Sequence, residues 1–96
     1  MHESALEKYV REKVKKHGGR AFKWVCPGVA GVPDRICIFP GGCIVFIELK
    51  RQGVKDGMSL RQKKMYETLK NMGCNVRRIS SKDEFEKLMG ELGYEI

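Results

Sequence analysis

Helical periodicity marks the beginning of the chain. Between residues 3 and 17, Leu6, Val10 and Val14 recur every four residues on one stripe, and Lys and Glu fill the other faces. Gly18-Gly19 follows this segment, as is common after the last turn of a helix. The pattern predicts an amphipathic helix whose apolar stripe packs on a core.

Capping signals predict two further helices. Ser59 with Gln62, and Ser81 with Glu84, each fit a capping box, in which two side chains satisfy backbone N–H groups reciprocally. The apolar residues after each box keep the helical spacing, so both segments are expected to be amphipathic helices. These residues are Met65, Leu69 and Met72 in one segment, and Phe85, Leu88, Met89 and Leu92 in the other.

Runs rich in β-branched and aromatic residues predict four strands, with a loop at residues 27–33 and a turn at residues 40–42. The third strand is apolar on both faces until Glu48, which indicates a central strand covered on both sides. The order is helix, three strands, helix, strand, helix, which predicts one domain over residues 1–96 of mixed α/β (α+β) class. The predicted strands are Arg20 to Cys26, Arg35 to Phe39, Cys43 to Lys50 and Cys74 to Ile79.

The charge balance points to a polyanionic partner. The chain carries a formal charge of +7, from 19 Lys and Arg against 12 Asp and Glu. Nucleic acid is the commonest such partner, and an anionic membrane surface is the alternative. No apolar run approaches the roughly 18 residues that a spanning helix needs, and the charged N-terminus does not resemble a secretory signal. We expect a cytoplasmic protein with no membrane partner and no small-molecule cofactor.

The four cysteines, at positions 26, 37, 43 and 74, include no C-x-x-C pair. They are expected to be reduced and mostly buried core residues. A zinc site that combines them with His2 or His17 is the alternative. It is disfavoured because structural zinc sites usually show closely spaced ligand pairs.

Carboxylates at two strand ends carry the candidate chemistry. Asp34 begins the second strand, and Glu48 and Lys50 end the third. Because strand side chains alternate, Glu48 and Lys50 are expected on one face. A hairpin at residues 40–42 would bring Asp34 and Glu48 to the same end of the sheet. Two carboxylates there would form an oxygen-rich site suited to Mg²⁺ or Mn²⁺.

Such an ion activates a water molecule and neutralises charge on a phosphate. Lys50 would orient that water or offset charge in the transition state. The backbone carbonyl of Leu49, between the two functional side chains, could add a metal ligand.

These residues resemble the signature of the PD-(D/E)xK nuclease superfamily, with Pro33-Asp34 followed by Glu48-Leu49-Lys50 on the next strand. More narrowly, the chain is similar to the virus-type replication-repair nuclease (VRR-NUC) domain over roughly residues 3–89. Glu7, the segment at residues 28–33 and Ser59-Leu60-Arg61-Gln62 also carry this similarity. The resemblance implies a restriction-endonuclease-like αβββαβα core and metal-dependent cleavage of DNA. It also implies a phage setting and dimeric enzymes that act on branched DNA, including four-way junctions.

The resemblance assigns roles that the residues alone leave open. It selects Glu7 as a direct or water-mediated metal ligand, whereas the simpler interpretation is surface charge on a helix, with Glu3 one turn earlier on nearly the same face. It places Gln62 near the scissile phosphate or a metal-bound water. That role competes with the capping of Ser59 for the same side chain.

Basic residues are expected to bind DNA through its phosphates and not through its sequence. Taken singly, each of them is also explained as solvated surface charge. Trp24 is expected in the core or a dimer interface more than as a base-stacking residue. Arg77 and Arg78 face opposite ways on a strand, so at most one of them shares a surface with the site. The predicted DNA-binding residues are Arg51, Lys55, Arg61, Lys63 and Lys64.

The sequence therefore predicts a Mg²⁺- or Mn²⁺-dependent DNA endonuclease, with a homodimeric four-way (Holliday) junction resolvase as the favoured form. Two copies would place two sites on opposed strands, as symmetric incision requires. A nuclease that trims flaps or ends is the first alternative, and a non-catalytic DNA-binding module on the same fold is the second. RNA binding is disfavoured because no aromatic-rich RNP-like strand is present.

Overall fold

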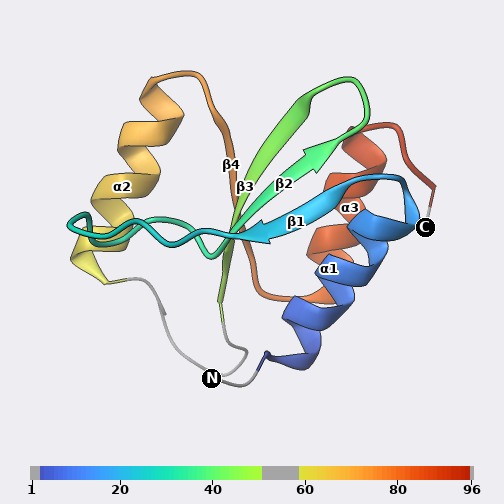
Figure 1. Ribbon diagram of the computed structural model, residues 1–96, viewed down its shortest axis with the longest axis horizontal. Helices are drawn as coiled ribbons and strands as arrows, with labels where there is room; N and C mark the ends of the chain where they lie inside the picture. Colours follow the sequence, from blue (N-terminus) through green and yellow to red (C-terminus); the bar gives the residue numbers. More distant parts are fainter. Residues whose placement is uncertain (1–2, 51–58, 96) are drawn as a thin grey trace.

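A computed structural model describes residues 3–50 and 59–95 of the protein. The elements follow the predicted order and surround a four-stranded sheet (Figure 1). The first strand is shorter than predicted, because the chain leaves the sheet at Trp24 and enters the loop before Asp34. The elements are α1 (Ala5–Lys16), β1 (Arg20–Lys23), β2 (Arg35–Phe39), β3 (Cys43–Leu49), α2 (Leu60–Asn71), β4 (Asn75–Ile79) and α3 (Lys82–Glu91).

The sheet has the strand order β1-β2-β3-β4, antiparallel except for the parallel pair β3–β4. The predicted hairpin between β2 and β3 is confirmed, with Phe39 opposite Cys43 and Arg35 opposite Ile47. Gly41 and Gly42 form its turn with φ angles of 86° and 79°, a left-handed conformation that favours glycine. This register brings the start of β2 and the end of β3 together at one end of the sheet.

The core lies between one face of the sheet and the helices α1 and α3, which pack beside each other (Figure 1). The predicted stripes of both helices face it, with Val10, Val14, Phe85 and Met89 fully buried. The core residues of the sheet occupy every second position along their strands, because successive side chains of a strand point to opposite faces. They are Ala21, Cys37, Phe39, Val45, Ile47 and Ile79.

The other face of the sheet carries α2 and is only partly covered. The helix buries Leu69, while Met72, predicted to lie on its apolar stripe, is its C-cap residue and is 66% exposed. A helix about 10 Å wide covers roughly two strands spaced about 4.8 Å apart, so one helix beside β4 leaves the rest open. The prediction that β3 is covered on both faces is therefore wrong: Ile44 is 45% exposed.

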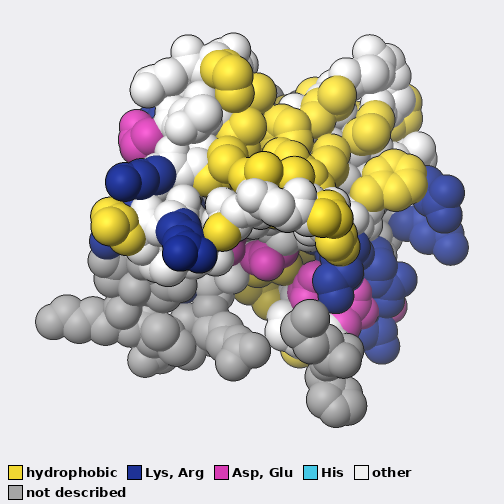
Figure 2. Space-filling model, turned by 60° about the vertical axis from the view of Figure 1, so that its left-hand side comes forward, with side chains coloured by type: hydrophobic (Ala, Val, Ile, Leu, Met, Phe, Trp, Pro, Cys, Tyr) yellow, Lys and Arg dark blue, Asp and Glu magenta, His cyan; other side chains and the backbone are white. Residues whose placement is uncertain are grey.

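Hydrophobic side chains gather on this uncovered area (Figure 2). We call it the open face and define it by residues of β1, β2 and β3 that share one side of the sheet. Phe22 and Ile38 on it are 45% and 36% exposed. Its members are Phe22, Ile36, Ile38, Ile44 and Phe46.

The capping box predicted at Ser59 and Gln62 is complete. At the start of α3 only half of the predicted box forms. The Ser81 hydroxyl accepts a hydrogen bond from the Glu84 N–H at 3.1 Å, but the Glu84 carboxylate contacts the backbone N–H and hydroxyl of Ser80. The carboxylate still satisfies a backbone N–H group near the helix start, one residue earlier than expected.

The loop between β1 and β2 rests directly on the first turn of α2. Gly31 has a φ angle of 85°, and a Cβ atom at this position would lie 2.6 Å from the Arg61 carbonyl oxygen and 2.9 Å from the Gln62 nitrogen. Only a residue without a side chain allows such an approach between two backbones. The contact ties the segment that leads into Asp34 to the helical turn that carries Gln62.

We predict that Gly31→Ala lowers the free energy of unfolding at least twice as much as Gly28→Ala, measured by urea denaturation. Both glycines have left-handed backbones, so each substitution carries a strain of about 1–2 kcal/mol. Gly28 is the matched control because a Cβ there meets nothing within 4 Å, whereas Gly31→Ala adds a clash with backbone. Equal decreases in the free energy of unfolding for the two variants would contradict the close contact between the loop and α2.

Candidate active site

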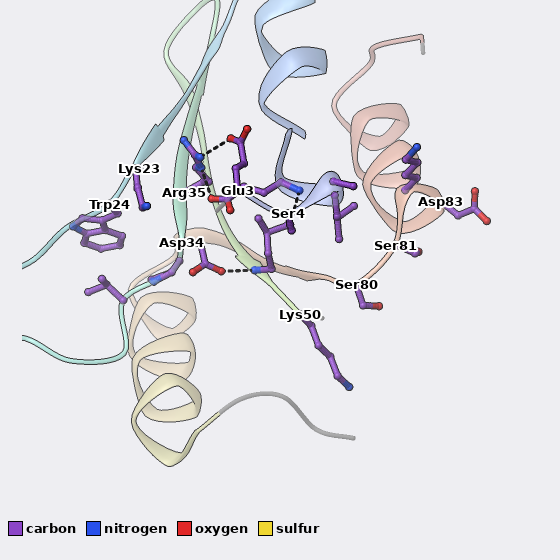
Figure 3. A pocket seen from close by; sticks show the side chains of 17 residues that line it. Glu3, Ser4, Lys23, Trp24, Asp34, Arg35, Lys50, Ser80, Ser81 and Asp83 are labelled. Atoms are coloured by element: carbon purple, nitrogen blue, oxygen red, sulfur yellow. Dashed lines mark hydrogen bonds and ion pairs between the residues drawn. The ribbon is translucent and has the colours of Figure 1, made fainter. Parts of the chain in front are cut away.

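Two carboxyl groups meet where β2 begins and β3 ends. Asp34 immediately precedes Arg35, which pairs with Ile47, so Asp34 lies across the ladder from Glu48. The backbone N–H of Leu49 donates a 2.7 Å hydrogen bond to Asp34 Oδ2 (Figure 3). This bond fixes the aspartate at the end of the strand that carries Glu48. We call Asp34 and Glu48 the carboxylate pair.

Glu48 is buried, with 5% of its surface exposed. Burial, followed by the negative charge of Asp34 and a hydrogen bond to it, raises the pKa of Glu48 to about 8. Arg78, which lies on β4 opposite Glu48 in the β3–β4 register, lowers the pKa of Glu48 through its positive charge. Near neutral pH the carboxylate pair therefore needs either a shared proton or additional positive charge.

Gln62 serves both the helix and the pair. Its Oε1 atom accepts a 2.8 Å hydrogen bond from the Ser59 N–H, and its Nε2 atom donates a 2.8 Å hydrogen bond to Glu48 Oε1. The amide has a donor and an acceptor end, so these two contacts do not compete. The helix cap itself therefore fixes the side chain that orients Glu48.

Lys50 lies just beyond the end of β3, and its backbone N–H donates to the Ile79 carbonyl at 2.8 Å. It lines a cavity of about 790 Å³ together with Asp34 and Leu49. Its side chain extends away from Asp34 (Figure 3). The structure thus brings Lys50 to the same cavity as Asp34, and leaves the ammonium group directed outward.

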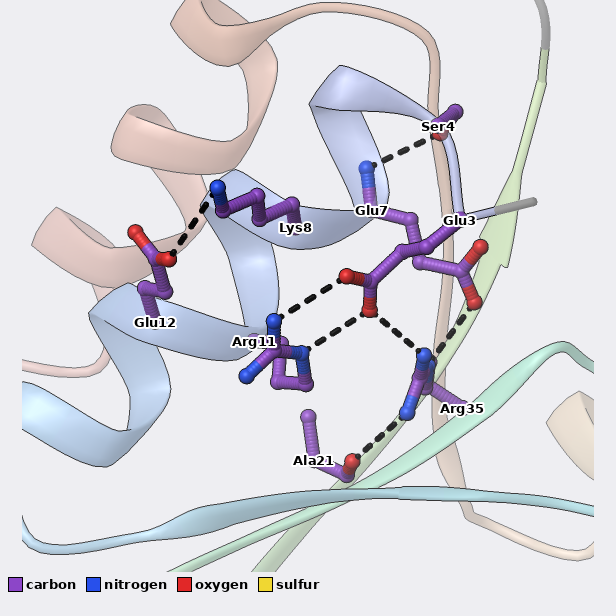
Figure 4. Close-up of polar contacts among 8 residues, drawn as sticks. All are labelled: Glu3, Ser4, Glu7, Lys8, Arg11, Glu12, Ala21 and Arg35. Carbon is purple, nitrogen blue, oxygen red and sulfur yellow. Dashed lines mark hydrogen bonds and ion pairs between the residues drawn. The ribbon is translucent and has the colours of Figure 1, made fainter.

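Glu7 also lines this cavity, but its carboxylate is bound to an arginine (Figure 4). The buried Arg35 donates from Nε to Glu7 at 2.8 Å, from Nη2 to Glu3 at 2.9 Å and from Nη1 to the Ala21 carbonyl at 3.1 Å. Glu3 is shared with Arg11, whose Nε atom lies 2.8 Å away. Both candidate glutamates, Glu3 just before α1 and Glu7 in its first turn, are therefore bound to Arg35. The metal-ligand role of Glu7 stays a prediction.

Two arginines at the site were not selected from the sequence. Arg35 follows Asp34 directly, and its alternation with Cys37 and Phe39 puts it on the buried face, which was a usable signal. Arg78 could be chosen over Arg77 only once the pairing of β3 with β4 was known. Arg77 instead forms an ion pair with Glu91, the last residue of α3, and its Nη2 atom lies 2.7 Å from Glu91 Oε2.

The donor set of the carboxylate pair fits a hard divalent cation. Two carboxylates can hold Mg²⁺ when water and substrate phosphate supply the remaining ligands, and the Leu49 carbonyl is predicted to add one. Within residues 3–50 and 59–95, no three His, Cys, Asp or Glu residues gather closely enough to form a complete protein cage.

The remaining predicted residues are distributed as follows. Arg61, Lys63 and Lys64 are exposed on α2, while Arg51 and Lys55 lie outside the described residues.

The cysteines are free thiols, but of the four only Cys37 is buried, and its burial raises the pKa of the thiol to about 12. The expectation of mostly buried cysteines is thus wrong. None of the described helices is long and apolar enough to cross a membrane.

Comparison with known proteins identifies relatives by sequence and by structure. No family model matches the chain. A protein named "Putative nuclease p44", from Acyrthosiphon pisum secondary endosymbiont phage 1, is 47% identical over 53 residues. That segment covers 55% of this chain and 57% of the phage protein, so the match spans little more than half of either.

A solved structure described as a VRR_NUC domain superposes with a TM-score of 0.80. The two chains are 30% identical, and the alignment covers 93% of this chain and 94% of the other. The likeness therefore includes the whole arrangement of sheet and helices that forms the carboxylate pair, and the chain belongs to the VRR-NUC family.

Proposed function

We propose that this protein is a Mg²⁺- or Mn²⁺-dependent deoxyribonuclease that hydrolyses phosphodiester bonds in structured DNA. The observation that carries the proposal is the carboxylate pair itself, in which the buried Glu48 lies across the ladder from Asp34 at the end of the sheet. Membership of the VRR-NUC family and a relative named as a nuclease support it. The net charge of +7 favours a polyanionic substrate.

The roles of the side chains follow from their positions. Asp34, Glu48 and the Leu49 carbonyl would hold the cation, which supplies an activated water and neutralises the phosphate. Gln62 keeps Glu48 oriented through its 2.8 Å hydrogen bond. Lys50 would turn toward a bound phosphate and offset its charge. Glu7 joins the metal ligands only after it leaves Arg35 or through a water between them.

Exposed basic residues at the start of α2 would guide DNA toward the pair. Arg61, Lys63 and Lys64 lie in the helical turns next to Gln62, which contacts Glu48. Together with Arg51 and Lys55, they would neutralise phosphates on either side of the cut. Such contacts fix the position of the DNA without reading its sequence.

A homodimer is the favoured assembly, and a four-way junction the favoured substrate. The open face is apolar, whereas the net charge of +7 makes two copies repel each other at long range. Packing the open faces of two copies would bury apolar surface and keep the basic surfaces apart. The twofold axis would then relate two active sites, which matches the symmetric cuts of a junction resolvase.

We expect the protein to nick a labelled four-way junction in Mg²⁺ or Mn²⁺ and to be inactive in EDTA. Lys50→Ala should lower the rate by at least about 100-fold, the usual effect of removing one group that stabilises charge in a transition state. Lys87→Ala, an exposed lysine on α3, removes the same charge away from the cavity and should cleave normally.

Blunt duplex and flap substrates, run beside the junction, separate the alternatives. Cleavage of flaps or ends instead of junctions would retain the active site and replace the resolvase by a trimming nuclease. Binding of all three DNAs without cleavage in either metal would favour the non-catalytic module and contradict the enzymatic proposal.

Ile44→Lys is expected to convert the dimer to monomers, because it places a charge on the open face, opposite Ile38 on the neighbouring strand. Light scattering coupled to gel filtration would measure the mass of each protein. Met72→Lys is the control, since it also adds a lysine at an exposed apolar position but at the C-cap of α2. A wild-type protein that stays monomeric at concentrations where it cleaves junctions would contradict the dimer.

The carboxylate pair also predicts how stability of the metal-free protein depends on pH. Burial and the neighbouring Asp34 raise the pKa of Glu48 from its ordinary value of 4.5 to about 8 in the folded protein, so between these pH values the folded state binds more protons than the unfolded state. The free energy of unfolding should therefore fall as pH rises through this range in EDTA.

Glu48→Gln should flatten that slope, and Mg²⁺ should stabilise the wild type more than the variant at the alkaline end. Urea denaturation with and without metal measures both effects. An identical pH slope in the wild type and Glu48→Gln would show that the buried carboxyl is not responsible.

A further inference from the structure

Trp24 lies at the edge of the candidate active site. It follows β1 directly, and its backbone N–H donates a 3.1 Å hydrogen bond to the carbonyl of Asp34. Its side chain lines the same cavity as Asp34 and Lys50, and Asp34 lies between the other two in Figure 3. The sequence predicted a residue of the core or of a dimer interface. Trp24 is absent from the buried core and is partly exposed, and its place in a dimer interface stays a prediction.

The Trp24 indole packs against another ring on one side and borders the cavity on another. Its ring packs against Phe46, with centroids 5.2 Å apart and planes 38° from parallel. Phe46 is held in the central part of the sheet, between Ile36 and Val76. A ring fixed in this way loses little conformational freedom when a ligand stacks on it.

The lining of the cavity suits a nucleotide with an accessible base. At about 790 Å³ it lies in the upper part of the range of small-molecule sites, well beyond one hydrated cation and one phosphate. Lys23 stands beside Trp24, and Lys50 and Lys82 line other parts of the wall. The wall also includes the acidic residues Glu3, Glu7, Asp34 and Asp83, of which Glu3 and Glu7 are paired with Arg35. Basic side chains with an aromatic platform are the usual means of binding single-stranded nucleic acid, because the backbone meets cations and each base meets a ring.

We propose that Trp24 stacks on an unpaired base of the DNA strand whose phosphate reaches the carboxylate pair. The proposal rests on the proposed nuclease function and adds that a nucleotide beside the cut is unpaired in the bound DNA. A flap or single strand offers such a nucleotide directly, whereas a four-way junction would have to open a base pair at its branch point. Bases inside a continuous duplex stack on each other and offer no free face to an indole. Lys23 would contact a phosphate of the same nucleotide or its neighbour.

The test uses the fluorescence of the tryptophan itself, because Trp24 is the single tryptophan of the chain. The wild-type protein is titrated in EDTA, where no cleavage is expected, with a single strand, a blunt duplex of the same sequence and a duplex with an unpaired flap. We expect the single strand and the flap to quench Trp24 emission, and the blunt duplex to bind with little quenching. Equal quenching by all three DNAs, or none by any, would overturn the proposal.

Two substitutions separate stacking from packing. Trp24→Leu keeps an apolar contact for Phe46 but removes the aromatic face. It should weaken single-strand and flap binding by roughly 5- to 150-fold, the range of base–aromatic stacking, and leave blunt duplex binding unchanged. Trp24→Phe should restore most of the affinity. A Trp24→Leu protein that is folded and binds all three DNAs like the wild type would overturn the proposal.

Failure of the nuclease proposal and failure of the Trp24 proposal give different results. A wild type that cleaves no DNA in Mg²⁺ or Mn²⁺ contradicts the nuclease, while quenching in EDTA still decides whether the indole stacks. Normal cleavage without selective quenching retains the nuclease and rejects the role of Trp24.

Discussion

The register of the β2–β3 hairpin is the constraint on which the site depends. Asp34 meets Glu48 because Arg35 pairs with Ile47, and a slip of one residue would send alternate side chains to the opposite face. Burial of the core residues of β3 and the left-handed turn at residues 40–42 hold that register. The 2.7 Å bond from the Leu49 N–H to Asp34 adds a contact made by the site itself. The carboxylate pair is thus positioned by the same pairing that builds the core.

Charge is separated across this end of the sheet. On one side, Asp34 and the buried Glu48 form the carboxylate pair, with Arg78 opposite Glu48 on β4. On the other side, the buried Arg35 is satisfied by Glu3 and Glu7 from the start of α1. Breaking a buried ion pair leaves an uncompensated charge and is strongly unfavourable. Release of Glu7 to a metal ion would therefore have to be offset by the ion, which makes a water-mediated role for Glu7 the less demanding one.

Local patterns in the sequence predict most of the fold. Periodicity, capping residues and turn residues gave the order of elements, and β2 matches its predicted bounds. They also paired Asp34 with Glu48, because a tight turn forces antiparallel neighbours into register. The features that the sequence did not predict arise where distant segments meet. The contact of Glu7 with Arg35, the exposure of Ile44 and the place of Trp24 beside the cavity depend on how helices and loops cover the sheet, which no short pattern encodes.

Phe46 connects the two surfaces that the proposals use. It belongs to the open face, in line with Phe22 and Ile36 across the sheet, and its ring also packs against Trp24 beside the cavity. A second copy on the open face would cover one side of Phe46, while Trp24 packs against the same ring beside the cavity. Because the sheet already holds Phe46 between Ile36 and Val76, covering it would leave the indole in place. In a dimer formed on the open face, assembly and the binding of an unpaired base would therefore be compatible, since one aromatic contact supports both surfaces.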